Sequence, residues 1–342
     1  MNKKLDYIVY IGRFQPCHLA HIEVMKQALT QADNLIVLVG SAMQPRTIRN
    51  PFLWQERSEM ILNSLPTHIR DRTIPLPLRD IKYNDQKWVK QVQDLVIGVA
   101  GSDSTIGIIG HSKDETSYYL KMFPQWELTD VENIKDIHAS EIRDDFFSID
   151  IEKFDIGIGR YLPTAIHSYM KAFALRSEYE QLVREYDFIQ TYKQAWAGAP
   201  HPPIFVTVDA VVVQAGHVLL VRRRAEPGRG LFALPGGFVN KQEKLRDAAI
   251  RELREETKIK VPDPVLRGSI TKEFVADEPN RSLRGRTISH VFAIELNAGD
   301  LPKVKGSDDA DKALWVPLST FERMEDQMFE DHYHLVQKLA YN

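Results

Sequence analysis

The chain has 342 residues, 43% of them hydrophobic and 27% charged, with a formal net charge of −3 at pH 7. This length accommodates two ordinary globular domains, and the mild charge indicates no general attraction to nucleic acids or membranes. No apolar stretch reaches the roughly 20 residues of a membrane span. A single cysteine excludes an intrachain disulfide and is typical of a reducing compartment, so we expect a cytoplasmic protein.

The first landmark is the string GRFQPCHLAH at residues 12–21. It follows an apolar run and precedes a helical pattern, which predicts a buried strand, a tight glycine turn and a helix N-terminus. His18 and His21 are three residues apart, so they would share one face of the first turn, where free N–H groups and the positive end of the dipole lie. Together with Arg13 they predict a phosphate site. The alternative is a plain corner with two surface histidines.

Strand and helix patterns alternate through the first half of the chain. Apolar runs predict the strands, and helical periodicity predicts most of the helices. One helix is predicted by an N-cap followed by proline, at Asn50-Pro51. This alternation indicates a doubly wound, Rossmann-like α/β domain, in which ligands bind beyond the carboxyl ends of the strands. The expected strands are residues 7–11, 35–39, 73–78 (an edge strand, because of its prolines) and 105–110, and the expected helices are residues 22–29, 51–65 and 88–99.

A second candidate phosphate site lies in the string IHASEIRDDF at residues 137–146. Ser140 can cap a helix that begins at Glu141, which would place Arg143 in the first turn beside free N–H groups. Taken alone, the string favours the alternative, an ordinary capped helix that carries a surface arginine.

These two strings resemble the GxFxPxHxGH and ISxxxxR signatures of the nucleotidyltransferase superfamily. Ala20 stands where the first signature usually has glycine, and His138 where the second usually has serine. Three further segments narrow the resemblance to nicotinamide-nucleotide adenylyltransferases of the archaeal type: residues 40–57, the segment around Asn84 and Trp88, and residues 110–126.

This resemblance covers about residues 5–170 and implies that the domain transfers AMP from ATP to nicotinamide mononucleotide (NMN), giving NAD and pyrophosphate. The phosphate of NMN is the nucleophile, so the enzyme would only position the reactants and neutralise charge. Another phosphate acceptor, such as phosphopantetheine, is the alternative.

The same resemblance assigns roles to individual residues. It implies that His18, His21, Arg13 and Arg143 contact the phosphates of ATP, with Mg²⁺ bridging them. Trp88 would stack on the nicotinamide ring, although at helical spacing it is equally compatible with a core aromatic. The nucleotide-binding set is completed by Gly12, Phe14, Asn84 and Ser140.

The middle of the chain predicts a connection between two domains. Residues 162–196 have the pattern of two consecutive helices, and the string GAPHPP at residues 198–203 stops any helix. We therefore expect a first domain, a helical connector with a proline-rich linker, and a second domain, over residues 1–175, 176–202 and 203–342 respectively.

The second half contains a dense group of carboxylates. Two β-branched runs, residues 204–213 and 217–221, predict a hairpin, and LPGGF at residues 234–238 leads into a helix over about residues 242–258. Glu252, Glu255 and Glu256 lie at i, i+3 and i+4 and so share one helix face. Carboxylate oxygens are the ligands that Mg²⁺ prefers, but the alternative is a surface helix whose charges Arg251 and Arg254 balance.

The spacing of these residues resembles the Nudix box, GX5EX7REUXEEXGU, from Gly237 to Ile259, with Lys258 in place of the final glycine. The resemblance implies an α/β/α sandwich and a hydrolase in which Glu252, Glu255 and Glu256 bind Mg²⁺ or Mn²⁺. It also implies that Glu243 and Arg251 form a structural pair.

The segment EPNRSLRGRTIS at residues 278–289 resembles the ADP-ribose pyrophosphatase branch of the Nudix hydrolases. It implies that Arg281, Arg284 and Arg286, on a loop before a strand at residues 287–296, bind ADP-ribose, which would be cleaved to AMP and ribose 5-phosphate. A strand at 314–317 and a helix at about 330–340 would complete the sandwich. The general base stays open among Asp277, Glu278, Asp308 and Glu325.

Both halves together resemble the bifunctional NMN adenylyltransferase/Nudix hydrolase family. The resemblance implies ATP, NMN, NAD and ADP-ribose as ligands, and homo-oligomers. The alternative is that the second domain is a non-hydrolytic ADP-ribose sensor that regulates the first.

Overall fold

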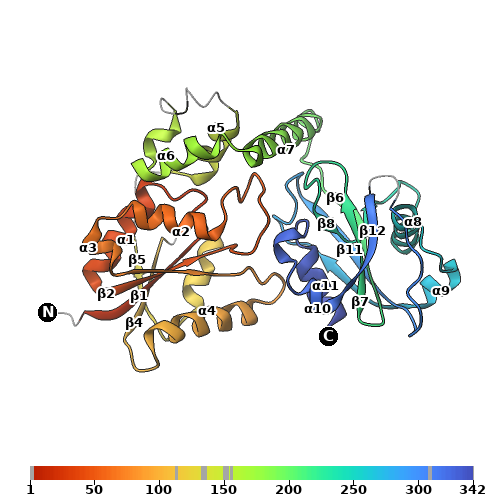
Figure 1. Ribbon diagram of the computed structural model, residues 1–342, viewed down its shortest axis with the longest axis horizontal. Helices are drawn as coiled ribbons and strands as arrows, with labels where there is room; N and C mark the ends of the chain where they lie inside the picture. The colour runs from red at the N-terminus through yellow and green to blue at the C-terminus, as the bar shows by residue number, and fades with distance from the viewer. Residues whose placement is uncertain are drawn as a thin grey trace. The chain divides into compact units, whose positions relative to one another are not determined.

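The computed structural model describes residues 4–111, 115–131, 137–148, 154, 157–306 and 310–341. The chain divides into two compact units, Met1–Val183 and Arg184–Asn342 (Figure 1). The division falls inside helix α7 (Ser177–Gln194), so the residues expected to form the connector are shared between the units. None of the helices within the described ranges is both long and apolar enough to cross a membrane.

The first unit is built on a parallel five-stranded sheet of order β3-β2-β1-β4-β5. This confirms the predicted doubly wound fold, including the edge position of β3. Helix α4 packs on one face through Val92 and Val96, which contact Val9 and Ile11, and α1 and α2 cover the other face (Figure 1). The strands are β1 (Leu5–Gly12), β2 (Ala32–Val39), β3 (Thr73–Pro77), β4 (Ile106–Gly110) and β5 (Glu127–Asp130).

The helices of the first unit largely follow the predicted pattern, and residues 162–196 do contain two consecutive helices. Strand β5 was missed because its sequence, ELTD, is short and polar. The helical elements are α1 (Leu19–Gln31), α2 (Trp54–Asn63), α3 (Thr67–Arg70), α4 (Asp85–Ala100), η1 (Glu115–Met122), α5 (Ala139–Ser148), η2 (Ile158–Tyr161), α6 (Thr164–Phe173) and α7.

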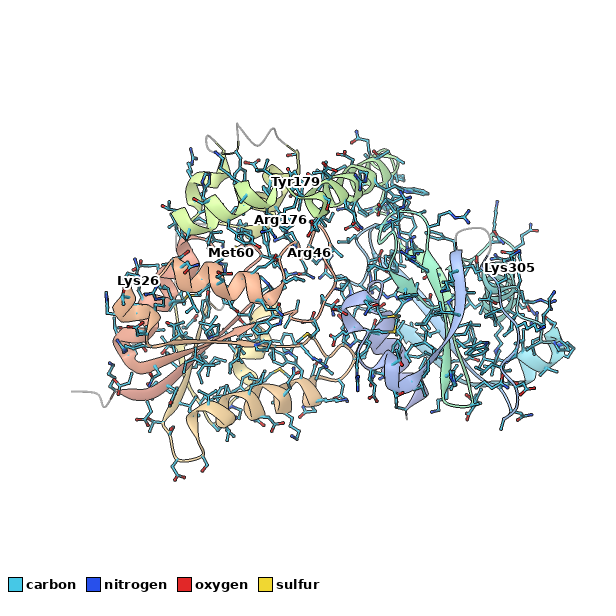
Figure 2. All side chains as sticks on the ribbon, viewed as in Figure 1. Lys26, Arg46, Met60, Arg176, Tyr179 and Lys305 are labelled. Atoms are coloured by element: carbon cyan, nitrogen blue, oxygen red, sulfur yellow. The ribbon has the colours of Figure 1, made fainter. Side chains whose placement is uncertain are left out.

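The start of α2 corrects a prediction. The helix begins at Trp54 and not at residue 51, because the Glu56 carboxylate accepts the Leu53 N–H at 2.7 Å and fixes the first turn there. Arg46 donates to both oxygens of Glu56, and Arg176 reaches the same carboxylate at 3.5 Å (Figure 2). A local capping contact therefore marks where this helix begins, and two arginines bind the carboxylate that makes it.

The second unit contains a mixed sheet of order β10-β11-β6-β7-β12, with β8 paired to β7 and β9 paired to β6. The predicted hairpin is confirmed: β6 and β7 pair across a turn at Ala215 and Gly216, both with positive φ. The strands are β6 (Phe205–Gln214), β7 (His217–Arg223), β8 (Phe232–Ala233), β9 (Gly236–Phe238), β10 (Ile270–Ala276), β11 (Thr287–Glu295) and β12 (Ala310–Pro317).

Helices cover both faces of this sheet, as the predicted α/β/α sandwich requires (Figure 1). Alternate residues of β6 face the two sides: Ala210 and Val212 pack in the core with Ile250 and Leu253 of α8, and α11 contacts β6 and β11. Helix α8 begins at residue 245, three later than predicted. The helical elements are α8 (Leu245–Thr257), α9 (Asp263–Gly268), α10 (Leu318–Phe321), η3 (Glu325–Gln327) and α11 (His332–Ala340).

Candidate active sites

The turn after β1 shows why glycine stands at its corner. A Cβ on Gly12 would lie 2.7 Å from the ring of Phe14, a residue whose own φ is 52°. The Phe14 ring is 2% exposed and packs edge-on against Tyr10 and His21. The buried ring of Phe14 supports the turn and His21 from inside, and its part in nucleotide binding stays a prediction.

The two histidines of the first motif stack at the start of α1. His18 is the N-cap residue, and its ring centroid lies 3.7 Å from that of His21. The His18 N–H donates to His21 Nδ1 at 3.2 Å, which leaves the proton of His21 on Nε2. Among the described residues, none makes a hydrogen bond to the buried Nδ1 of His18.

Both imidazoles are neutral at pH 7. Burial is the main cause that lowers the pKa of His18 to about 4, and the neighbouring His138 is the second. Burial, followed by the effect of His18, lowers the pKa of His21 well below its usual value. The pair can therefore donate or accept hydrogen bonds, but the positive charge of a phosphate site must come from arginines.

Two arginines supply that charge around the same turn. Arg13 follows Gly12 and is exposed. Arg143, on α5, donates to the carbonyl oxygen of Gln15 at 2.6 Å, so its side chain reaches the first motif from a helix far along the chain. Burial, and next Arg13, lower the pKa of Arg143 to about 10, at which it stays charged at neutral pH. The two predicted phosphate motifs thus converge.

Three other predicted residues take structural positions. Helix α5 begins at Ala139, so Ser140 lies inside its first turn and is not its cap. Asn84 is the N-cap of α4, where its side chain accepts the Lys87 N–H at 3.0 Å. Trp88 is half-buried and packs edge-on against Tyr119, in the core cluster that α4 covers. Residues 112–114 of the third segment lie outside the described residues.

In the second unit, Arg251 organises the carboxylates of α8. It donates two hydrogen bonds to Glu243, both at 2.8 Å, which is the structural pair that the resemblance implies. Its Nη1 also donates to Glu252 at 2.8 Å and Glu255 at 2.9 Å. One guanidinium therefore contacts three carboxylates, whereas Arg254, the second cation of the charge-balanced alternative, lies 3.8 Å from Asp263.

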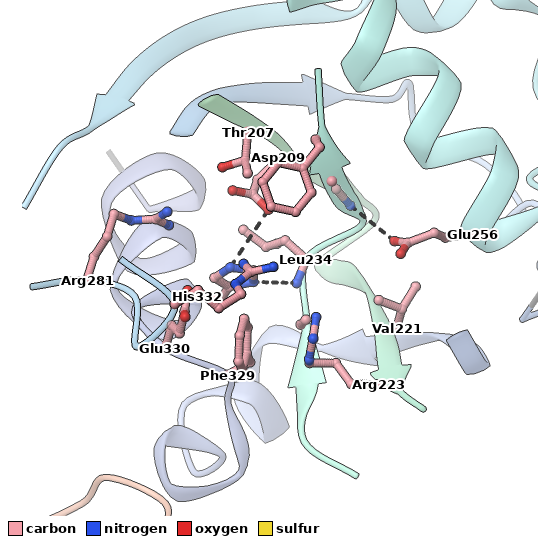
Figure 3. A pocket seen from close by; sticks show the side chains of 15 residues that line it. Thr207, Asp209, Val221, Arg223, Leu234, Glu256, Arg281, Phe329, Glu330 and His332 are labelled. Atoms are coloured by element: carbon pink, nitrogen blue, oxygen red, sulfur yellow. Dashed lines mark hydrogen bonds and ion pairs between the residues drawn. The ribbon is translucent and has the colours of Figure 1, made fainter. Parts of the chain in front are cut away.

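Glu256 is held differently, by the glycine turn before the helix. Gly236 donates its N–H to Glu256 Oε2 at 3.1 Å (Figure 3). Burial nevertheless raises the pKa of Glu256 to about 8, and it also raises the pKa of Glu252. Burial therefore disfavours the charged forms of these two carboxyls, and Glu256 is largely protonated at pH 7 in the chain alone.

Glu256 opens into a pocket that gathers charged residues from distant segments (Figure 3). Leu234 donates its N–H to His332 Nδ1 at 2.9 Å, and His332 Nε2 lies 3.7 Å from Asp209. Burial lowers the pKa of His332, so the ring is neutral at pH 7. The charged or titratable lining residues are Asp209, Arg223, Glu256, Arg281, Arg284, Glu330 and His332.

Comparison with known proteins decides the family. The cytidylyltransferase-like family matches residues 9–145, and the NUDIX domain family matches residues 203–339. A crystal structure of a bifunctional NMN adenylyltransferase/ADP ribose pyrophosphatase from Francisella tularensis is 36% identical, covers 99% of both chains and superimposes with a TM-score of 0.92. The chain belongs to the bifunctional NMN adenylyltransferase/ADP-ribose pyrophosphatase family.

Each half also has curated relatives of its own. The nicotinamide/nicotinic acid mononucleotide adenylyltransferase of Acinetobacter baylyi is 40% identical over 54% of this chain and 94% of its own length. The ADP-ribose pyrophosphatase of Methanocaldococcus jannaschii is 36% identical over 36% of this chain and 67% of its own length. A second Francisella structure of the bifunctional family, 36% identical over 98% of this chain, contains AMP and a manganese ion and has a TM-score of 0.92.

The divalent metal of Nudix hydrolases fits the carboxylates of α8 by their chemistry. Burial disfavours the charged forms of Glu252 and Glu256, which a bound cation would stabilise, and Gly237 leaves Glu252 room, since a Cβ there would lie 2.6 Å from its Oε1. Within the described ranges, no three Asp, Glu, His or Cys side chains converge as a ready ligand group. Arg251 instead donates hydrogen bonds to the carboxylates of Glu252 and Glu255, which keeps them from forming such a group.

The three arginines predicted to bind ADP-ribose occupy different positions relative to the pocket. Arg281 lines the pocket but is 4% exposed and makes a bidentate pair with Asp331, at 2.9 and 2.7 Å. Arg284 lines the pocket and lies over the Phe238 ring, 5.3 Å from its centroid. Arg286 donates to the Asp277 carbonyl oxygen and is not among the lining residues.

Four carboxylates were predicted as candidates for the general base. Those that lie in the described part of the chain do not line this pocket. Asp277, Glu278 and Glu325 are absent from its lining, and Asp308 lies outside the described residues. The pocket instead contains Glu330, whose Oε1 is buried without a hydrogen-bond partner among the described residues. Sequence reasoning missed Glu330 and also Asp209, although an aspartate inside the β-branched run of β6 was a usable signal.

Proposed function

We propose that the chain is a bifunctional enzyme of NAD metabolism. The first unit transfers AMP from ATP to NMN, giving NAD and pyrophosphate, and the second hydrolyses ADP-ribose to AMP and ribose 5-phosphate. The full-length likeness to the Francisella protein, with both predicted motif sets present, carries this proposal. The named activities of the Acinetobacter and Methanocaldococcus proteins support the two halves separately.

Adenylyl transfer needs no nucleophile from the protein. An oxygen of the NMN phosphate attacks the α-phosphorus of ATP, a new P–O–P link forms, and the bond to the β-phosphate breaks with pyrophosphate carrying away the electron pair. Arg13 and Arg143 neutralise the phosphates, and neutral His18 and His21 hydrogen-bond them. Gly12 and Ser140 lie beside this site, and Asn84 and Trp88 hold the nicotinamide end.

Hydrolysis of ADP-ribose uses the α8 carboxylates. Glu252, Glu255 and Glu256 would hold Mg²⁺, or Mn²⁺ in its place, once Glu252 and Glu255 were free of their hydrogen bonds to Arg251. Such an ion supplies Lewis-acid polarisation of the diphosphate. Glu330 is our candidate to accept the proton of the attacking water, because its buried Oε1 has no hydrogen-bond partner within the described ranges. Arg284 and Arg281 position the substrate, with Arg286 at the edge of the loop.

We further propose a cytoplasmic homo-oligomer that binds neither nucleic acid nor membrane. Its functional domains would be residues 1–175 and 203–342, with residues 176–202 as a connector. The ADP-ribose sensor is the less favoured alternative, because the Francisella and Methanocaldococcus relatives are named as pyrophosphatases.

Phosphorus NMR of the purified protein tests both activities. With ATP, NMN and Mg²⁺ we expect NAD and pyrophosphate, and with ADP-ribose and Mg²⁺ we expect AMP and ribose 5-phosphate. Tight ADP-ribose binding without turnover, at any Mg²⁺ or Mn²⁺ concentration, would establish the sensor. Adenylylation of phosphopantetheine in place of NMN would overturn the proposed acceptor.

A further inference from the structure

Arg57 is a charged side chain enclosed by the first unit. It lies in the first turns of α2 and is 1% exposed. Its Nη1 donates to the carbonyl oxygens of Arg13 at 2.5 Å and Gly40 at 2.7 Å, and its Nη2 donates to Ser41 at 3.3 Å. Among the described residues its hydrogen-bond acceptors are all backbone carbonyls, so no carboxylate pairs with it directly.

These carbonyls lie at the carboxyl ends of the strands, on the side of the sheet that carries the nucleotide motif. Gly12 ends β1, Val39 ends β2, and the two strands are paired there in parallel. Gly40 also donates its N–H to the Gly12 carbonyl at 2.8 Å. Arg57 therefore ties the turn after β1 to the turn after β2, at the end of the sheet where doubly wound folds bind ligands.

The charge on Arg57 persists at neutral pH. Burial lowers its pKa to about 10, with Asp80 opposing that shift and Arg13 adding to it. Arg143 is affected in the same way by burial and by Arg13. Arg13 thus repels two buried guanidinium groups, and a polyphosphate bound at that turn would offset the repulsion.

We propose that Arg57 is a positioning residue for adenylyl transfer, which fixes the turn that carries Arg13 and adds a buried positive charge behind it. The inference rests on the proposed function of the first unit. The competing explanation is a staple that only stabilises the fold, in which case kinetics per folded molecule would not change.

The test compares Arg57→Met with Arg57→Lys in the full chain, by steady-state kinetics of NAD formation. We expect Arg57→Met to lower kcat about 10- to 100-fold, because small misplacements of catalytic groups have effects of this size. We also expect it to raise KM for ATP about fivefold through the lost charge. Arg57→Lys keeps the charge but cannot bridge three carbonyls, so it should restore KM for ATP while kcat stays about tenfold low.

Arg72→Met is the matched control. Arg72 donates to the carbonyls of Asp33 at 2.6 Å, Ala32 at 2.7 Å and Leu29 at 3.2 Å, but at the amino end of β2. Its loss should lower stability without changing kcat or KM per folded molecule. Urea unfolding curves give the folded fraction of the first unit in every variant, and ADP-ribose hydrolysis shows only that the second unit is intact.

Three outcomes separate the explanations. Wild-type kcat and KM in both Arg57 variants, once corrected for the folded fraction, would overturn the positioning role. If Arg57→Met does not fold, Arg57→Lys alone decides, since wild-type kcat in that variant overturns the proposal and a tenfold loss supports it. If the wild-type chain makes no NAD, the proposed function fails independently of Arg57.

Discussion

Gly236 and Gly237 are adjacent, yet an added methyl group meets different neighbours at each. At Gly236 a Cβ would lie 2.2 Å from the Val208 carbonyl oxygen, in the paired strand β6. At Gly237 it would lie 2.6 Å from Glu252 Oε1, which is the end of a side chain. The first clash is with backbone that cannot yield without breaking strand pairing, whereas the second displaces one predicted metal ligand.

We therefore expect Gly236→Ala to lower the free energy of unfolding of the second unit by about 2 kcal/mol or more. The second unit should then unfold at a markedly lower urea concentration. Gly237→Ala should keep near wild-type stability but need at least about tenfold more Mg²⁺ for ADP-ribose hydrolysis. Urea unfolding and a metal titration of the initial rate measure the two effects. Equal loss of stability in both variants would contradict this assignment.

His18 predicts a pH dependence of stability. Its pKa is about 4 in the folded chain against 6.5 ordinarily, so between those values the unfolded chain binds a proton that the folded chain does not. The free energy of unfolding therefore falls as pH falls through this window, by at most about 1.4 kcal/mol per pH unit. Above pH 6.5 the contribution is fully present.

Asn is a suitable replacement, because it does not titrate and is favoured at N-caps. From pH 7 to pH 5 we expect wild type to lose about 1–2 kcal/mol more unfolding free energy than His18→Asn. Urea titrations at the two pH values measure the difference. The same loss in both proteins would show that His18 is not buried in its neutral form.

At the scale of elements, the second half of α7 is packed as part of the second unit. Glu185 is 5% exposed and accepts the Gly228 N–H at 3.1 Å. A Cβ on Gly228 would lie 2.4 Å from Phe329, and Arg223 lies over the Phe329 ring at 4.0 Å. Both Phe329 and Arg223 line the pocket of the second unit, so the helix supports this pocket through the loop.

Glu185→Ala should accordingly raise KM for ADP-ribose about fivefold, because Gly228 loses a buried acceptor and the loop shifts. Glu185→Gln retains one acceptor oxygen and should show a smaller change. NAD synthesis serves as the control, since this contact lies wholly within the second unit. An unchanged KM in the alanine variant would show that the loop holds its position without α7.

At the scale of the whole molecule, each unit has its own sheet and its own set of site residues. We therefore expect the two activities to be lost separately. Glu256→Gln should abolish ADP-ribose hydrolysis, and His18→Asn should lower NAD synthesis about 100-fold or more, each without changing the other rate beyond twofold. Parallel assays on both variants measure this. Loss of both activities in either variant would contradict independent sites.

Local spacing predicted much of this molecule. Helical spacing alone put Glu252, Glu255 and Glu256 on one face, while the pairing of Glu243 with Arg251 came from the likeness to the Nudix box. Lys258 shows the tolerance of such patterns: it adopts a φ of 47° and closes the helix with a hydrogen bond to Arg254 at 3.0 Å, where the family pattern has glycine. The likeness to a known family added the substrates that spacing could not name.

Other features required the tertiary structure. Arg46 and Arg176 meet at Glu56 although they lie far apart in the chain, and only the fold shows that the Phe14 ring is buried. The Asp209–His332 contact joins residues far apart in the chain, as does the path from Arg57 to the Arg13 carbonyl.

The sequence by itself determined the two sheet classes, the motif residues and the chemistry that each motif can support. These follow from periodicity and from residues only a few positions apart, where chain geometry sets the distances. Tertiary structure alone decided which side chains are buried, which carbonyls the arginines satisfy and which carboxylate enters the pocket. Those outcomes depend on contacts between distant segments, whose partners and desolvation are fixed only when the sheets and helices pack.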